Sequence, residues 1–303
     1  MNDTESWTIL TVLGWTTGYL QGKGITTARL DAEVLLAHAL NMDRVGLYLN
    51  YDRPLQPPEL ARFRELARRR AKREPVAYIR GFKEFWSLEF EVSSPAVLIP
   101  RPETELLVEE TLKAARGFSG QPLRLLEVGT GSGAVAISVA KELGRSVLAS
   151  DNSAVALAVA RRNAQRHEAA VKFIEADLLD ESFGEAAFEV VFSNPPYVSS
   201  AGLATAPPEL SFEPRSALDG GPDGLEVIRR LVQQAPRVLT PGGWLLLEVG
   251  SGQAAEVAGL LEAAGFEAVT RVPDLAGMER LVKGRQGGVA TDQPPAPATH
   301  YGF

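Results

Sequence analysis

The sequence predicts an α/β protein in which a small helical N-terminal domain precedes a seven-stranded, mostly parallel, doubly wound sheet. Three observations lead to this prediction. The first 75 residues carry apolar residues at the three- and four-residue spacing of amphipathic helices. From residue 123 onward, short apolar runs alternate with amphipathic stretches, which is the rhythm of βαβ units. Between these parts, residues 79–99 are rich in aromatic and β-branched side chains and predict a β-hairpin.

The N-terminal domain is expected to contain helices at residues 7–20, 28–40 and 58–74. Pro57 and Pro58 open the last of these, where a missing N–H costs little. Residues 62–73 of that helix hold seven basic side chains and one acid, Glu65. Two interpretations stay open: a solvated helix face, or a docking surface for an acidic or phosphate-bearing partner.

The sheet domain follows a helix expected at residues 105–115. Five strands are expected at residues 124–128, 146–150, 171–175, 190–193 and 244–249, and two more at 267–272 and 279–283. Helices are expected between them at residues 134–143, 154–167, 225–235 and 254–264. We therefore divide the chain into a helical domain (1–75), a hairpin linker (76–104), a sheet domain (105–285) and a Pro-, Gly- and Ala-rich tail (286–303) that predicts disorder.

Composition excludes several classes of protein. The 303 residues include no cysteine, which rules out a disulfide scaffold and thiol chemistry. The three histidines, His38, His167 and His300, lack ligand spacing, so we expect no metal site. No apolar run is long enough to span a bilayer and the N-terminus lacks the features of a secretory signal, so we expect a cytoplasmic protein without membrane contact.

Charge is unevenly distributed along the chain. Residues 1–80 hold 12 Lys and Arg against 9 Asp and Glu, whereas the remainder holds 19 against 29. A net charge of −10 on the larger part disfavours non-specific clamping of DNA or RNA. We therefore expect no direct nucleic-acid partner.

A glycine-rich turn joins the first expected strand to its helix and predicts a nucleoside site. Its residues are Gly129, Thr130, Gly131, Ser132 and Gly133, and alternate glycines let the backbone approach a ligand closely. Asp151 ends the second strand, where an acid accepts hydrogen bonds from ribose hydroxyls, and Asp177 follows the third, where an adenine edge could be read. This turn also fits G-x-G-x-x-A, so by itself it leaves nicotinamide dinucleotides possible.

Asn194, Pro195, Pro196 and Tyr197 close the fourth expected strand and predict the chemistry. Two prolines remove two backbone donors, so an asparagine oxygen beside a proline carbonyl forms a paired acceptor. Such a pair suits an –NH₂ group, which offers two N–H donors in one plane. Holding both N–H groups aims the lone pair of a poorly nucleophilic nitrogen at a sulfonium methyl group. The four residues therefore predict a methyltransferase that uses S-adenosylmethionine and acts on a planar nitrogen.

The chain resembles the HemK/PrmC family of peptide chain release factor glutamine methyltransferases over about residues 5–285. The matching stretches are E-P-V-A-Y-I (74–79), V-L-I-P-R-P-E-T-E (97–105), the glycine turn, N-P-P-Y (194–197) and E-P-R-S-A-L-D-G-G (213–221). N-P-P-Y alone is shared with enzymes that methylate DNA and RNA, whereas the stretches around Arg101 and Arg215 are far more diagnostic.

The resemblance implies a Rossmann-like class I methyltransferase sheet, S-adenosylmethionine as cofactor, and methylation of the Gly-Gly-Gln glutamine of release factors. By position, residues 129–133 would line the methionine part of the cofactor and Asp151 would hold its ribose. Asn194 would face both cofactor and glutamine, while Pro195, Pro196 and Tyr197 would shape the glutamine pocket. Leu178 stands where some members have an aromatic residue against adenine. Glu127 stands where the family often has aspartate, and we expect it to keep the negative charge.

Other classes of function stay open beside this one. The runner-up is an N-methyltransferase acting on amino groups of rRNA, tRNA or DNA, for which a more basic body would be expected. A nicotinamide oxidoreductase fits the glycine turn but gives no account of Asn194 to Tyr197. A non-catalytic binding module is the weakest alternative, because every motif position is present.

Overall fold

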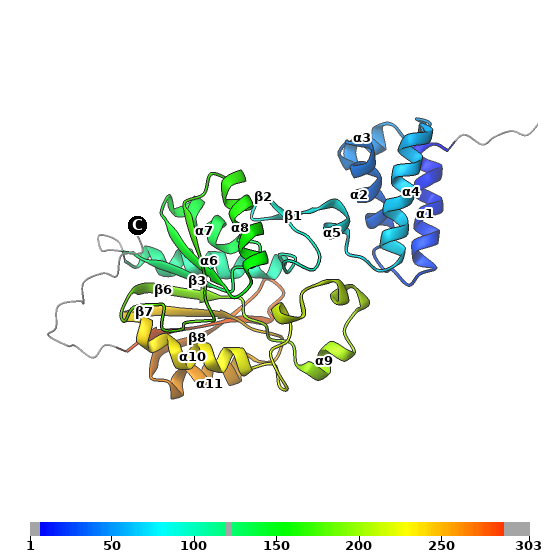
Figure 1. Cartoon of the computed structure of the whole chain (residues 1–303). Helices are drawn as coiled ribbons and strands as arrows, with labels where there is room; N and C mark the ends of the chain where they lie inside the picture. The colour runs from blue at the N-terminus through cyan, green and yellow to red at the C-terminus, as the bar shows by residue number, and fades with distance from the viewer. Residues whose placement is uncertain (1–6, 119–122, 288–303) are drawn as a thin grey trace, which may run out of the picture. The chain divides into compact units, whose positions relative to one another are not determined.

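The computed structural model describes residues 7–118 and 123–287, which group into two compact units (Figure 1). The helical unit holds residues 7–82 together with Pro207–Phe212, and the sheet unit holds the rest. The domain bounds expected from the sequence stay a prediction, and they did not foresee that residues 207–212 would join the helical unit. Of the tail expected to be disordered, residues 288–303 lie outside the described part of the chain.

The helical unit is built from α1 (Ile9–Gln21), α2 (Ala28–Leu40), α3 (Arg44–Leu49), α4 (Pro57–Ala71) and α5 (Val76–Arg80). Local sequence sets where these helices begin. Thr8 and Thr11 form a capping box before α1, and α4 starts with proline after a Gln56–Glu59 capping box. The apolar faces of the helices meet in one buried core that includes Leu13, Leu36 and Phe63.

The sheet unit begins at Lys83, within the hairpin of β1 (Phe82–Phe85) and β2 (Leu88–Glu91), and continues with η1 (Pro102–Thr104) and α6 (Glu105–Arg116). Its sheet contains β3 (Leu125–Val128), β4 (Val147–Asp151), β5 (Val171–Glu175), β6 (Phe188–Ser193), β7 (Leu239–Glu248), β8 (Phe266–Pro273) and β9 (Glu279–Gln286). The remaining helices of this unit are α7 (Ala134–Leu143), α8 (Ala154–Arg166), α9 (Ser200–Ala204), α10 (Glu226–Val238), α11 (Ala254–Ala263) and η3 (Arg215–Ala217), whereas η2 (Pro208–Phe212) belongs to the helical unit.

The seven strands lie in the order β5-β4-β3-β6-β7-β9-β8, and β9 pairs antiparallel with both β7 and β8. Side chains alternate between the two faces, as strand geometry requires. Leu125 packs with α6 and α7 on one face, while Leu126 packs with α10 and α11 on the other. Figure 1 shows these two helical layers on opposite sides of the sheet. The α/β fold with a seven-stranded sheet is confirmed.

Strand order reverses at β3, which pairs in parallel with β4 on one side and β6 on the other. Ligands of doubly wound sheets bind beyond the carboxyl ends of the strands at this switch point. Val128, the last residue of β3, is in register with Ser150 of β4 and with Ser193 of β6. The fold therefore places the glycine turn, Asp151 and Asn194 at one edge of the sheet. No helix of the described residues is long and apolar enough to cross a membrane.

Candidate active site

The glycine turn exposes its backbone at the end of β3. Gly129, Gly131 and Gly133 all have positive φ angles (74°, 55° and 82°), a conformation that disfavours any side chain. A Cβ at Gly133 would come within 3.0 Å of Ile137 Cδ1, so this glycine is also needed for packing. Beside Gly129 and Gly131 there is open space instead. The turn therefore has room for a ligand against its backbone.

Asp151 is held against this turn at the end of β4. One carboxylate oxygen accepts a hydrogen bond from the Gly131 N–H (2.8 Å) and the other from the Ser153 N–H (2.9 Å). Burial raises the pKa of Asp151, and these two backbone donors oppose that rise. The carboxylate is thus fixed in orientation before any ligand arrives.

A cavity of about 420 Å³ opens beside the turn. Its volume lies in the range of small-molecule sites. Gly131 and Asp151 line it. The other lining residues come from 94–98, from 153–156 just after Asp151, and from 214–217, namely Ser94, Pro95, Ala96, Val97, Leu98, Ser153, Val155, Ala156, Pro214, Ser216 and Ala217. Two of the residues expected to bind cofactor therefore share one cavity.

Asp177 and Leu178 do not line this cavity. The carboxylate of Asp177 pairs with Arg230 (2.6 Å) at the surface, and Leu178 packs against the core beneath α10 and α11. Leu178 also has a positive φ of 56°. The predicted adenine contacts of these two residues stay a prediction. No group of His, Cys, Asp or Glu side chains among the described residues could hold a metal ion.

Asn194 follows directly on β6. Its Nδ2 donates a hydrogen bond to the hydroxyl of Thr104 (3.2 Å), which leaves Oδ1 as an acceptor. Tyr197 lies nearby with its hydroxyl 3.4 Å from Oε1 of Glu248. Burial, followed by the nearby Glu248 carboxylate, raises the pKa of Tyr197 well above its ordinary value, so the phenol stays neutral.

Residues 213–224 support the turn formed by Asn194 to Tyr197. Backbone hydrogen bonds run from Val198 N–H to the Leu218 carbonyl (2.9 Å) and from Gly220 N–H to the Val198 carbonyl (2.8 Å). The contact is close: a Cβ at Gly220 would lie 2.8 Å from the Pro196 carbonyl oxygen, and one at Gly224 would lie 2.4 Å from that of Tyr197. The absence of side chains at Gly220 and Gly224 thus lets this segment pack closely against the turn of Asn194 to Tyr197, which we call the acceptor turn.

Glu213 joins the two most diagnostic stretches of the sequence. Its carboxylate is buried, pairs with Arg101, and accepts a hydrogen bond from the Ile99 N–H (3.1 Å). The segment before η1 and the segment around Arg215 are therefore anchored to each other at the cavity wall.

Comparison with known proteins identifies the family. Residues 11–81 match the PrmC N-terminal domain, and residues 102–207 match the methyltransferase small domain. A release factor glutamine methyltransferase of Geobacter sulfurreducens is 48% identical over 285 residues, covering 93% of this chain and 98% of the relative. The chain belongs to the release factor glutamine methyltransferase family. A second member, from Rhodopirellula baltica, is 40% identical and covers 93% of this chain and 97% of its own length.

Two solved structures resemble this member of the release factor glutamine methyltransferase family only in fold. A methyltransferase from Pyrococcus furiosus superposes with a TM-score of 0.51 at 21% identity, covering 68% of this chain and 92% of the other. The hMettl16 catalytic domain, solved with a 3′UTR hairpin, gives a TM-score of 0.53 at 16% identity, covering 80% of this chain and 84% of the other.

Sequence reasoning missed Thr104 and Glu248, the two side chains that contact Asn194 and Tyr197. Glu248 is 3% exposed at the end of β7, and burial raises its pKa to about 7. One signal was available, because Glu248 interrupts the apolar run from Trp244 to Val249 at the carboxyl end of a central strand. Thr104 stood within the matching stretch 97–105, which did not give it a role of its own.

The basic side chains of residues 62–73 fall into two groups with different surroundings. Arg70 is buried and pairs with Asp31 (2.7 Å) and Glu209 (3.0 Å), and Arg73 also pairs with Glu209 (2.9 Å). These arginines hold residues 207–212 within the helical unit.

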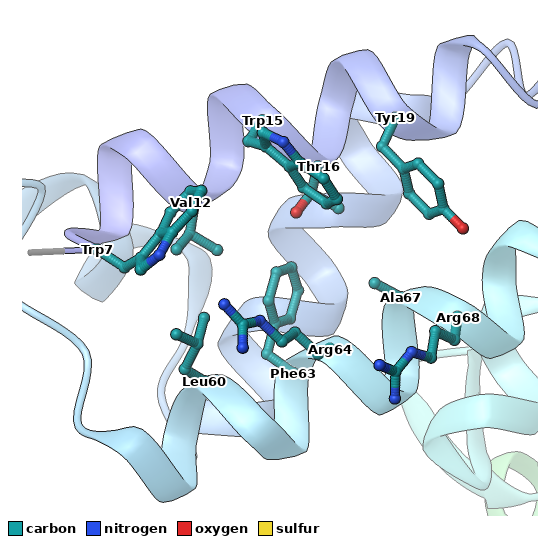
Figure 2. A pocket seen from close by; sticks show the side chains of 10 residues that line it. All are labelled: Trp7, Val12, Trp15, Thr16, Tyr19, Leu60, Phe63, Arg64, Ala67 and Arg68. Carbon is teal, nitrogen blue, oxygen red and sulfur yellow. The ribbon is translucent and has the colours of Figure 1, made fainter. Parts of the chain in front are cut away.

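Two other arginines of the cluster line an aromatic groove in the same unit. Figure 2 shows Trp15 and Tyr19 of α1, with Trp7 just before the helix, facing Arg64 and Arg68 of α4. The cavity measures about 380 Å³, and Trp15 is 58% exposed although it stacks on Tyr19 at 5.3 Å. The positive charges of Arg64 and Arg68 therefore lie beside exposed aromatic side chains.

Proposed function

We propose that this protein transfers a methyl group from S-adenosylmethionine to the side-chain amide nitrogen of the glutamine in the Gly-Gly-Gln motif of release factors, in the cytoplasm. One observation carries the proposal: the free acceptor oxygen of Asn194 and the open glycine turn lie at the ends of two paired strands, with Val128 in register with Ser193. Family membership supports the identity of the substrate.

The residues at the switch point fit a nucleoside cofactor. The backbone of Gly129 and Gly131 would lie against it, and Asp151 offers carboxylate oxygens for ribose hydroxyls. When bound, S-adenosylmethionine supplies the methyl group on a cationic sulfur. The cavity beside Gly131 and Asp151 provides volume for such a ligand.

The acceptor turn fits a primary amide. Asn194 Oδ1 and a proline carbonyl would each accept one N–H of the glutamine, which keeps the nitrogen in one orientation. Correct orientation of this kind is worth up to about 7 to 11 kcal/mol in favourable cases. Tyr197 stays neutral and would pack against the flat amide. The proton is lost from the already methylated nitrogen, so no strong base is needed beforehand.

The helical unit would supply the docking surface for the release factor. Arg64 and Arg68 provide positive charge, and Trp7, Trp15 and Tyr19 provide apolar surface, so an acidic segment with apolar side chains is the complementary partner. Arg70 and Arg73 are used inside the unit, which narrows the docking face to the outward part of the cluster.

The activity is tested by incubating the protein with labelled S-adenosylmethionine and purified release factor, then locating the methyl group by mass spectrometry. A methyl group on the Gly-Gly-Gln glutamine is expected. Ribosomal RNA, tRNA and DNA are offered in parallel, and label on any of them with none on the release factor would replace this function by the amino-methylating alternative.

The docking surface is tested with the double variant Arg64→Glu/Arg68→Glu. We expect a higher KM for whole release factor and an unchanged rate on a short Gly-Gly-Gln peptide, because the peptide lacks the acidic segment with apolar side chains that this surface would bind. Arg145→Glu, an exposed reversal just after α7, is the matched control. Equal KM values for the double variant and the control would show that the arginines are merely solvated.

A further inference from the structure

Asn163 is a fully buried polar side chain on α8 that joins two segments far from it in the chain. Its Oδ1 accepts a hydrogen bond from the Glu91 N–H (2.8 Å). Its Nδ2 donates to the Glu91 carbonyl (3.1 Å) and to the Ser132 carbonyl (2.9 Å). Both N–H donors of the amide are therefore committed to carbonyl oxygens, and the side chain ties the end of β2 to the glycine turn.

The partners of Asn163 also determine which way its amide faces. The Glu91 N–H needs an acceptor, so Oδ1 lies toward it, whereas the carbonyls of Glu91 and Ser132 need donors, so Nδ2 lies toward them. Aspartate has the same shape but would place a carboxylate oxygen against two carbonyl oxygens. Buried backbone groups that lose their partners cost free energy. Position 163 therefore requires the N–H groups of an amide as well as its shape.

The two segments that Asn163 joins continue into the wall of the cavity beside the glycine turn. Ser132 directly follows Gly131, which lines that cavity, and Glu91 shortly precedes the lining segment 94–98. Asn163 itself does not line the cavity. It is therefore placed behind the wall, where it holds two parts of the wall at one spacing.

Helix α8 also holds the glycine turn by packing. Ala160 lies one helical turn before Asn163 on the same face, and a Cβ added at Gly133 would lie 3.2 Å from the Ala160 Cβ. Gly133 therefore lies directly against the helix, and Ser132 beside it is held by the hydrogen bond from Asn163. The turn is thus attached to α8 at its end, while open space remains beside its first two glycines.

We propose that Asn163 is a positioning residue for the cofactor: it holds the glycine turn at a fixed spacing from segment 94–98 and so sets the affinity for S-adenosylmethionine. The inference rests on the cofactor site of the proposed function. A turn that is already held in its binding geometry loses less conformational freedom when the ligand arrives, which strengthens binding. None of the three hydrogen bonds of Asn163 reaches the acceptor turn, so a change at this position should act on cofactor binding rather than on methyl transfer.

Calorimetry with S-adenosylhomocysteine and steady-state kinetics with release factor test this role. Asn163→Ala removes the amide, and Asn163→Leu removes it while keeping nearly the same side-chain volume. We expect both variants to weaken S-adenosylhomocysteine binding and to raise the KM for S-adenosylmethionine about tenfold, with kcat within about threefold of wild type. Wild-type affinity in either folded variant, or a fall in kcat with unchanged affinity, would overturn the proposal.

Arg162→Ala is the matched control for a purely structural role. Arg162 adjoins Asn163 on α8 and pairs with the Glu91 carboxylate (2.6 Å), so it joins the same helix to the same strand. Its hydrogen bonds go to Glu91 and to the Ala158 carbonyl rather than to the glycine turn. We expect wild-type affinity for S-adenosylhomocysteine in this variant, whatever its melting temperature. An equal loss of affinity in Arg162→Ala and Asn163→Ala would show that Asn163 only fastens the helix to the hairpin.

A measurement on the wild type decides the matter if the Asn163 variants do not fold. Because the Glu91 N–H is bonded to Asn163, S-adenosylhomocysteine bound at the glycine turn should slow hydrogen exchange of that amide as well as of the amides of the turn. Slower exchange at Gly131 with no change at Glu91 would overturn the proposal. A wild type that binds no S-adenosylhomocysteine would overturn the proposed cofactor site and this role with it, whereas binding without the effects above would count against Asn163 alone.

Discussion

Replacing Glu127 by glutamine should make the protein less sensitive to alkaline pH. Glu127 is 2% exposed on β3, where its Oε2 accepts hydrogen bonds from the Thr130 hydroxyl and the Ala136 N–H (3.0 Å). Burial raises its pKa to about 8, and the negative charge of Asp151 adds to that rise. From the sequence we expected Glu127 to keep a charge in place of the family's aspartate, whereas the structure indicates a largely neutral acid at pH 7.

The direction and the size of the expected change in unfolding free energy follow from proton linkage. The folded protein retains the Glu127 proton up to about pH 8, whereas the unfolded chain loses it near the ordinary value of 4.5. The stabilisation is therefore complete below pH 4.5 and is lost as pH rises through 8. At roughly 1.4 kcal/mol per pKa unit, the wild type should lose about 3 kcal/mol of unfolding free energy between pH 5.5 and 9 through this group alone.

Urea unfolding of wild type and Glu127→Gln, followed by far-UV circular dichroism at pH 5.5 and pH 9, measures the effect. Subtracting the variant removes the contributions of all other titrating groups, including Glu248. Glu109→Gln, an exposed change on α6, is the control and should match the wild type at both pH values. If wild type and Glu127→Gln lose equal unfolding free energy between these pH values, the conclusion that Glu127 is a neutral acid in the folded protein is wrong.

Three further changes have defined outcomes. Gly224→Ala places a Cβ 2.4 Å from the Tyr197 carbonyl oxygen and should lower kcat by displacing the acceptor turn, with S-adenosylhomocysteine binding in calorimetry retained; an unchanged kcat would contradict the close fit. Asp151→Ala should weaken S-adenosylhomocysteine binding at least about tenfold in calorimetry, and unchanged affinity would remove its ribose role. Arg70→Ala leaves Asp31 without its ion-pair partner and Glu209 paired with Arg73 alone, and should destabilise the helical unit by about 3 to 5 kcal/mol in urea unfolding. The exposed Arg68→Ala should cost less than about 1 kcal/mol, and similar losses in both variants would argue against the buried pair.

The fold was predictable because its signals are local and periodic. The central parallel strands β3, β4 and β6 are buried on both faces and appear as short apolar runs, and most of the longer helices show an apolar stripe. The sequence therefore placed Gly129, Asp151 and Asn194 at strand ends without reference to distant residues. The carboxyl ends of neighbouring parallel strands meet at one edge, so their proximity followed from topology alone.

The remaining features depend on contacts between residues far apart in the chain. Arg70 has the sequence features of an exposed basic residue, and only the distant partners Asp31 and Glu209 turn it into a buried ion pair. Thr104 gains its importance from Asn194, 90 residues later. Helical periodicity identifies a face but not the residues that will cover it, so neither contact could be read from spacing.

The acceptor turn depends on contacts from neighbouring residues because it contains two prolines. Pro195 and Pro196 keep their carbonyl acceptors but have no N–H groups, so they cannot donate the hydrogen bonds that usually stabilise a turn. Neighbouring residues support the turn instead: the Gly220 N–H donates to the Val198 carbonyl, and Gly224 packs against the Tyr197 carbonyl too closely for any side chain. If the turn holds a substrate amide as proposed, it does so only while Gly220 and Gly224 hold the turn, and substitutions at these glycines should lower activity as substitutions in the turn do.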